Sequence, residues 1–118
     1  MEAKAIGKYL KGSPQKARLV VDLVRGKKVE EALGILRFSR KRAARPIEKV
    51  LRSAITNAEQ KSATVSLEDL VVKEIFVDQG PTKWGRRVRP APMGRAYRQM
   101  RRQSHITVRL WDGKAEEV

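Results

Sequence analysis

The chain has 118 residues, of which 27 are Lys or Arg and 13 are Asp or Glu, so its formal net charge is +14 at pH 7. This length suits one domain, the 41% of hydrophobic residues can form a modest core, and the charge points to a polyanionic partner. The absence of cysteine excludes disulfides and thiolate metal sites and fits a reducing compartment. No stretch approaches the roughly 20 apolar residues of a membrane-spanning helix, and no N-terminal signal is visible, so we expect no membrane partner.

A short, partly exposed strand is predicted first, where the sequence EAKAIGKYLKG alternates small residues with basic or larger ones. A helix follows, because Ser13 can cap it, Pro14 suits the first helical position and Gly26 can close it with a positive φ. Its buried face consists of apolar residues at the spacing i, i+3, i+4 and i+7, namely Ala17, Val20, Val21 and Val24.

Two more helices are predicted before the middle of the chain. The segment VEEALGILRF places Val29, Ala32, Leu33 and Leu36 on one side of a helix of about three turns. The longest helical pattern runs from Ser39 to about Gln60, and Pro46 either kinks this helix or marks its true start. The outer face of the longest helix is basic, and its inward positions are Ala43, Ile47, Val50, Leu51, Ala54, Ile55 and Ala58.

Two strands in the second half, LVVKEIFVDQ and SHITVRLW, are predicted to form an antiparallel hairpin. Pairing Asp78 roughly opposite Ser104 puts the midpoint near Ala91, so that about eleven residues per arm, or roughly 35 Å when fully extended, project beyond the sheet. Trp84 and Tyr97 are nearly symmetric about this midpoint. They are candidates for stacking on bases or for a cross-strand pair that stiffens the arm, with a slight preference for the pair.

The segment between these strands carries the strongest functional signal. Residues 80–102 hold eight Lys or Arg and no Asp or Glu, and connections longer than about 12 to 15 residues are usually functional or disordered. Cations without counter-charges repel one another unless phosphates neutralise them. Seven of the eight are arginine, whose planar group suits bidentate phosphate contacts. The residues alone leave two candidates, namely shape-specific binding to folded RNA and an arm laid into a DNA groove.

No catalytic or metal site is predicted. His105 is the only histidine, and its place on the polar side of a strand indicates a surface or locally bonded residue. The acidic pairs are adjacent in sequence, so their side chains point apart and do not suggest acid–base work. We therefore expect no enzyme, no cofactor and no metal, and a hydrolase acting on nucleic acid is a distant third interpretation.

Five motifs occur in the order found in the bacterial form of large-subunit ribosomal protein twenty-two, namely SPQKARLVVDLVRGK, SAITNAE, FVDQGP, GRAYR and SHITV. The chain resembles that family over nearly its whole length. The resemblance implies an α+β fold with three helices packed on a small three-stranded antiparallel sheet and a long protruding β-hairpin. It also implies a place on ribosomal RNA near the exit of the peptide tunnel, with the hairpin along the tunnel wall. The entry TKWGRR and the tip VRPAPMG depart from the family pattern, so the roles of individual tip residues stay open.

These observations predict one RNA-binding domain over residues 1–118, with residues 80–102 as an extended basic hairpin arm and residues 112–118 as a frayed tail. The predicted function is that of a structural component of the large ribosomal subunit, which binds and organises ribosomal RNA while its hairpin lines the nascent-peptide exit tunnel. The alternative is a DNA-architectural protein with a basic β-ribbon arm.

The expected partners are large-subunit ribosomal RNA, neighbouring ribosomal proteins and the nascent peptide, with no homo-oligomer. The expected location is a cytoplasmic ribosome, and an organelle ribosome stays open. The predicted tunnel-tip residues are Val88, Arg89, Pro90, Ala91, Pro92 and Met93. The predicted RNA contacts are Lys16, Arg18, Lys27, Lys28, Lys41, Arg42, Lys83, Arg86, Arg87, Arg95, Arg98, Arg101 and Arg102.

Overall fold

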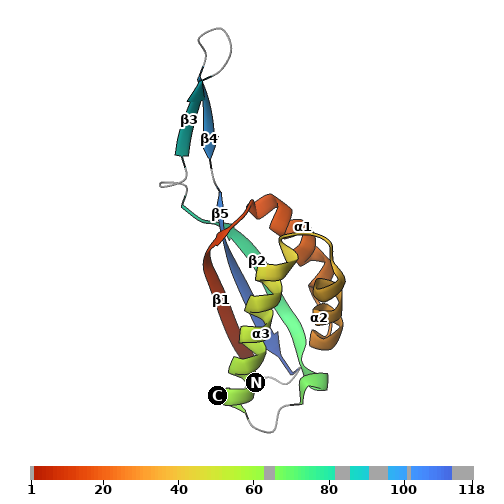
Figure 1. The fold of residues 1–118 in the computed structure, drawn as a ribbon. Helices are drawn as coiled ribbons and strands as arrows, with labels where there is room; N and C mark the ends of the chain where they lie inside the picture. The colour runs from red at the N-terminus through yellow and green to blue at the C-terminus, as the bar shows by residue number, and fades with distance from the viewer. Residues whose placement is uncertain (1, 63–65, 82–85, 91–95, 101, 113–118) are drawn as a thin grey trace.

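The computed structural model describes residues 2–62, 66–81, 86–90, 96–100 and 102–112, and of residues 86–90 and 96–100 it describes the backbone. In chain order the elements are β1 (Glu2–Lys11), α1 (Pro14–Val24), α2 (Val29–Phe38), α3 (Ala44–Lys61), a 3₁₀ turn η1 (Leu67–Asp69), β2 (Val71–Gln79), β3 (Arg86–Pro90), β4 (Ala96–Met100) and β5 (Gln103–Trp111). A three-stranded antiparallel sheet, in the order β1-β5-β2, carries the three helices, and β3 and β4 form a separate two-stranded sheet beyond its end (Figure 1). The predicted α+β fold, with three helices on a three-stranded antiparallel sheet, is confirmed.

The middle strand of the main sheet is β5, the last strand in the sequence. Both neighbours run antiparallel to it, with Ala5 of β1 and Ile75 of β2 opposite the same residue, Val108. Ile106, Val108 and Leu110 of β5 point toward the helices and are at most 2% exposed. Because this strand is paired on both sides and packed on one face, its apolar and β-branched composition is what the position requires.

Small residues allow α3 to pass close over β1. Ala54 and Ala58 of the helix are fully buried, and so, almost completely, are Ala3 and Ala5 of the strand. At Gly7 an added Cβ would lie 2.6 Å from Cγ2 of the helix residue Val50, so a larger residue there would force the Val50 side chain or the helix to shift. The alanines of α3 therefore permit the close approach of β1.

Helix α1 begins and ends where the sequence predicts, and its whole predicted apolar stripe is buried. Ser13 occupies the N-cap position, but its side chain makes no capping hydrogen bond. Gly26 adopts the expected positive φ, at 75°. In α2 the buried residues are Val29, Ala32 and Leu36, whereas Leu33 is half-buried.

Helix α3 begins at Ala44, five residues later than the predicted Ser39. Pro46 is its third residue and lies in the first turn, where a missing N–H removes no bond within the helix. The proline therefore marks the start of the helix and does not kink it, which is the second of the two predicted possibilities. The preceding residues form a turn, in which the Ala44 N–H donates to the Lys41 carbonyl over 3.2 Å.

The base of the hairpin is offset by one residue from the predicted register. Asp78 lies opposite His105, and Gln79 lies opposite Ser104. Between this ladder and the next pair, Arg86 with Met100, the chain has six residues (80–85) on the incoming side and three (101–103) on the outgoing side. The incoming side is thus longer, which moves the centre of the hairpin away from Ala91.

The second ladder corrects the prediction for the aromatic residues of the arm. Tyr97 lies opposite Arg89, so the predicted cross-strand pair with Trp84 is wrong, and Trp84 itself lies outside the described residues. The cause is the extra length of the incoming side. β3 ends at Pro90, as expected for a residue without an N–H to continue the ladder. The longest dimension of the molecule is 65 Å, against 31 and 18 Å for the others.

Candidate nucleic-acid interface

A groove of ≈ 800 Å³ opens at the end of the body from which the hairpin leaves. It lies between the end of β1, the first turns of α1 and the turn that leads into α3. Its apolar lining comes from Leu10, Ala17, Leu19, Ala43, Pro46 and Ile106, and its charged lining from Lys11, Lys16, Lys41 and Arg42. Every charged residue that lines the groove in the described part of the chain is therefore a cation.

The turn between β1 and α1 fixes this groove to the base of the hairpin. Gly12 in that turn has φ of 134°, which suits glycine, and its N–H donates to the Arg102 carbonyl over 3.1 Å. The Ser104 hydroxyl donates to the Gly12 carbonyl over 3.0 Å. Across the hairpin base the Gly80 N–H donates to the Gln103 carbonyl over 2.7 Å. The groove and the strands that lead into the arm are thus held as one unit.

Three of the predicted RNA contacts, Lys16, Lys41 and Arg42, meet at this groove although they come from separate parts of the sequence. All three are exposed. Among the ion pairs formed by described residues, none includes any of the three. No described carboxylate balances their charge, so an anionic ligand gains by displacing the solvent ions around them.

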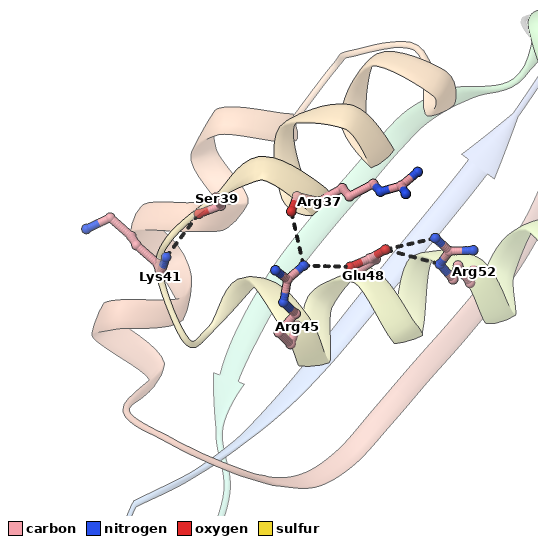
Figure 2. A network of polar contacts seen from close by, with 6 residues as sticks. All are labelled: Arg37, Ser39, Lys41, Arg45, Glu48 and Arg52. Carbon is pink, nitrogen blue, oxygen red and sulfur yellow. Dashed lines mark hydrogen bonds and ion pairs between the residues drawn. The ribbon is translucent and has the colours of Figure 1, made fainter.

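The arginines just beyond this turn behave differently, because they share one carboxylate. Glu48 Oε2 accepts from Arg45 Nη1 over 3.3 Å, and Glu48 Oε1 accepts from Arg52 Nη2 over 2.9 Å (Figure 2). Arg45 Nη1 also donates to the Arg37 carbonyl over 3.2 Å, which ties α3 to α2. The hydrogen bond from Arg52, together with the charges of both arginines, lowers the pKa of Glu48 below its ordinary value. In Figure 2 the Lys41 side chain points away from this network, and the Lys41 backbone N–H donates to Ser39 Oγ over 3.3 Å.

Arg18, another predicted RNA contact, forms hydrogen bonds within the protein. Its Nε and Nη2 donate to the Val77 carbonyl over 3.3 and 3.1 Å, and Arg25 likewise donates to the Ile75 carbonyl over 3.0 Å. Both carbonyls belong to β2, which is an edge strand. The two arginines therefore cover an edge that would otherwise present free acceptors.

Lys27 and Lys28 lie at the opposite end of the sheet from the groove. The Val72 N–H donates to the Lys27 carbonyl over 3.0 Å, and Lys28 forms an isolated bridge with Val71, the first residue of β2. Both lysine side chains are exposed. The predicted contacts on the body therefore fall into a set at the groove, Arg18 at the edge of β2, and a separate pair at the far end.

The structure places only part of the predicted arm. The backbone positions of Arg86, Arg87, Val88, Arg89 and Pro90 are in β3, and that of Arg98 is in β4, opposite Val88. Arg102 is exposed just before β5. The remaining predicted arm residues, Lys83, Ala91, Pro92, Met93, Arg95 and Arg101, lie outside the described residues, as does the predicted tail from residue 113 onward.

Lys11 is a groove residue that the sequence reasoning did not select. It is the last residue of β1 and is followed by the tight turn at Gly12. This turn brings Lys11 near Lys16 in the first turn of α1, so the sequence did contain a signal for selecting Lys11. The sequence reasoning also missed the apolar part of the groove, because Leu19 and Pro46 come together only after α1 and α3 have packed.

His105 is bonded locally, as predicted. Its Nδ1 accepts the Tyr9 N–H over 3.0 Å, and the two rings meet edge to face with centroids 5.0 Å apart. Tyr9 has φ of 58° at an irregularity in the β1 ladder, so the histidine helps to hold an unusual backbone. Within the described ranges no group of three or more His, Cys, Asp or Glu side chains is placed to hold a metal, and no helix is long and apolar enough to cross a membrane.

An α+β body with an unpaired basic groove at the root of a basic two-stranded projection is typical of a structural protein that binds a folded nucleic acid. Residues 5–111 match the family model of ribosomal protein L22p/L17e, and the chain belongs to that family. The prediction drawn from the five motifs is confirmed, and the family is one of structural ribosomal proteins and not of enzymes.

Several curated relatives match this chain over nearly their whole length. The large ribosomal subunit protein uL22 of Desulforamulus reducens is 55% identical over 97% of this chain and 98% of its own. The protein of the same name from Solibacter usitatus is 50% identical over 98% of this chain and 100% of its own. That of Syntrophus aciditrophicus is 56% identical over 93% of this chain and 97% of its own.

Proposed function

We propose that this protein is a structural component of the large ribosomal subunit that binds and organises ribosomal RNA. The observation that carries the proposal is a set of cations, Lys16, Lys41 and Arg42, that have no carboxylate partner among the described residues. They lie near a segment, residues 80–102, whose sequence has eight cations and no acid. Phosphates are the natural counter-charges for such a surface. Membership in a family of ribosomal proteins favours ribosomal RNA over the DNA-binding alternative.

The protein acts as one domain over residues 1–118, with residues 80–102 as its RNA-embedded arm. The proposed RNA contacts are those predicted from the sequence, with the groove set as the anchor of the body. Its partners are large-subunit ribosomal RNA and neighbouring ribosomal proteins, it works as a single copy, and its place is on a cytoplasmic ribosome of the bacterial type.

Sedimentation of a tagged full-length chain with ribosomal subunits tests this proposal. The tagged chain should be recovered with large subunits and remain there in moderate salt. Recovery in free or DNA-bound fractions would overturn the ribosomal function in favour of the architectural one. A matched sample carrying Lys16→Glu, Lys41→Glu and Arg42→Glu should fail to sediment with the subunits although it folds.

The tip of the arm, residues 88–93, lines the passage of the nascent peptide. Support for this comes from the two prolines at positions 90 and 92, which fix φ and donate no hydrogen bond, and from the short uncharged side chain of Ala91 between them. Because the chain has no cysteine, Met93→Cys creates a single thiol for crosslinking. Ribosomes that carry this variant and a stalled nascent chain should yield a crosslink to the peptide, whereas Ser53→Cys on exposed α3 should yield none. Equal crosslinking of the two thiols would contradict the tunnel position.

A further inference from the structure

The groove at the hairpin base has a feature that phosphate binding alone does not require, which is an apolar floor. Leu19 lines it and is 57% exposed, so much of this apolar side chain is in contact with water. Pro46, Ala43 and the half-buried Leu10 continue the same surface. An exposed apolar surface inside a concave site indicates a ligand that covers it.

The rim of the groove limits what this ligand can be. Lys11, Lys16, Lys41 and Arg42 line the groove together with the apolar residues, and all the described charged residues of the lining are basic. The nearest carboxylate along α3, that of Glu48, is held by Arg45 and Arg52 instead. The matching ligand is therefore an apolar group with negative charge next to it.

A nucleotide of RNA that has left its stack has this chemistry. Its base presents an apolar face, and the chain continues through a phosphate on either side. Sequence-specific recognition of RNA commonly uses such splayed bases, which pack on side chains or on the plane of an arginine. The volume of ≈ 800 Å³ lies within the range of about 300 to 1,000 Å³ that is usual for small-ligand sites, so one nucleotide fits.

We propose that the groove holds one unstacked nucleotide of large-subunit ribosomal RNA, with its base on Leu19 and Pro46 and its flanking phosphates on Lys16, Lys41 and Arg42. This rests on the proposed function and adds a specific site to it. Since the Gly12 turn joins the groove to the start of β5 through Arg102 and Ser104, the bound nucleotide fixes the RNA at the point where the arm enters it.

The test uses full-length protein and deproteinised large-subunit ribosomal RNA from a bacterium, with affinity measured over a range of salt concentrations. Leu19→Ala removes part of the apolar floor and no charge. The matched control is Leu23→Ala, one turn further along α1, where the leucine is 51% exposed but does not line the groove. We expect Leu19→Ala to weaken binding about tenfold without changing the salt dependence, and Leu23→Ala to bind as wild type does.

Lys16→Gln tests the charged part of the groove. It should weaken binding and also reduce the log–log salt slope by about 0.7 to 0.9, the contribution of one phosphate contact. Chemical probing of the bases should reveal a nucleotide that wild type protects and Leu19→Ala leaves reactive. Both variants are on the exposed surface, so thermal unfolding should match wild type and exclude misfolding as the cause.

Three outcomes would overturn the proposal. Equal binding by Leu19→Ala and Leu23→Ala, with a loss only in Lys16→Gln, would mean that the groove binds phosphates without a base, and the proposed function would stand. An effect of Leu19→Ala that is seen only in assembled subunits, and not on naked RNA, would mean that another protein covers the floor. Failure of wild type to prefer this RNA over duplex DNA would remove the proposed function and this site together.

Discussion

The two ends of the main sheet differ in the ion pairs that the described residues form, although Lys27 and Lys28 at the far end are exposed and belong to none of these pairs. At the end far from the hairpin, Lys73 pairs with Glu2 over 3.4 Å and Arg109 pairs with Glu74 over 3.4 Å. Lys73 also lies over the ring of Trp111, 4.7 Å from its centroid. At the hairpin end, Lys16 and Lys41 have no carboxylate partner among the described residues. Exposed ion pairs contribute little stability, about 0 to 1 kcal/mol each, so the difference concerns which charges are left available to a ligand.

The same contrast separates neighbours in sequence. Lys41 and Arg42 face the groove, whereas Arg45, three residues later, is held by Glu48 and by its own contact with α2. A count of basic residues does not distinguish these roles, because all three side chains are long and exposed. The presence or absence of a hydrogen-bond acceptor within the protein distinguishes these roles, and this difference makes the comparison testable.

The largest expected effect comes from reversing charge in the arm, where the sequence offers no acid at all. Arg86→Glu with Arg87→Glu should be outcompeted by wild type during incorporation into large subunits, by about 100-fold or more, because carboxylates would be buried against phosphates. The measurement is the ratio of tagged variant to wild type in purified subunits after co-expression. Equal incorporation would mean that these arginines stay away from RNA.

Removal of the arm should have the next largest effect and should separate arm from body. A chain that lacks residues 84–97 should keep its folded body, since the main sheet and helices bury the core without them. If the arm makes about four phosphate contacts, the log–log salt slope for binding to ribosomal RNA should decrease in magnitude by roughly three to four. An unchanged slope with an intact body, checked by thermal unfolding, would place all phosphate contacts on the body.

Arg18 offers a smaller and sharper distinction, because it is both a predicted RNA contact and a donor to the edge of β2. Arg18→Gln should lower the free energy of unfolding by about 0.5 to 1.5 kcal/mol, as expected for loss of a hydrogen bond to the Val77 carbonyl. It should change the salt slope less than Lys16→Gln does. If Arg18→Gln lowered the salt slope of RNA binding by a full unit and left the free energy of unfolding unchanged, Arg18 would instead act as an RNA contact like Lys16.

The smallest expected effect is the pH dependence of the Glu48 network. The pKa of Glu48 is lowered in the folded state from its ordinary value of 4.5, chiefly by the hydrogen bond from Arg52. The unfolded state therefore takes up this proton first, so the stability from Glu48 is present above about pH 4.5 and is lost as the pH falls through the folded-state pKa.

Urea unfolding of wild type and Glu48→Gln, from about pH 7 down to about pH 3, measures this effect. The stability difference between the two should shrink toward acid, and Arg52→Gln should remove most of the pH dependence that Glu48 supplies. A constant difference across this range would mean that the ion pairs do not stabilise the folded state.

Much of the fold was predictable because local signals agree with the packing. The stripe of Ala17, Val20, Val21 and Val24 predicts both the position and the buried face of α1, and Pro14 gives its start. The start of α3 was not predictable in the same way, since the basic residues before Ala44 are compatible with a helix. In the structure they form a turn at Lys41 instead. The family was also readable from the order of five short motifs.

The register of the arm and the shape of the groove were not predictable from the sequence. A hairpin with unequal sides has no local signature, so symmetry about Ala91 gave the wrong partner for Tyr97. The groove depends on residues far apart in the chain, such as Lys11, Leu19 and Pro46, and only the crossing of α1 and α3 at the end of β1 brings them together. Even so, three of its four cations were among the residues chosen for their charge.

The comparison between the two ends of the sheet is tested most directly by two variants that each lose two positive charges. One carries Lys16→Gln and Lys41→Gln at the groove, and the other carries Arg25→Gln and Lys73→Gln, whose native side chains are held by Asp22 and Glu2. Binding of both to large-subunit ribosomal RNA should be measured over a range of salt concentrations. The groove variant should lose about 100-fold in affinity and between one and two units of salt slope, while the other stays close to wild type. Equal losses in the two variants would contradict the account, because they would show that net charge alone, and not the unpaired cations beside the arm, governs binding.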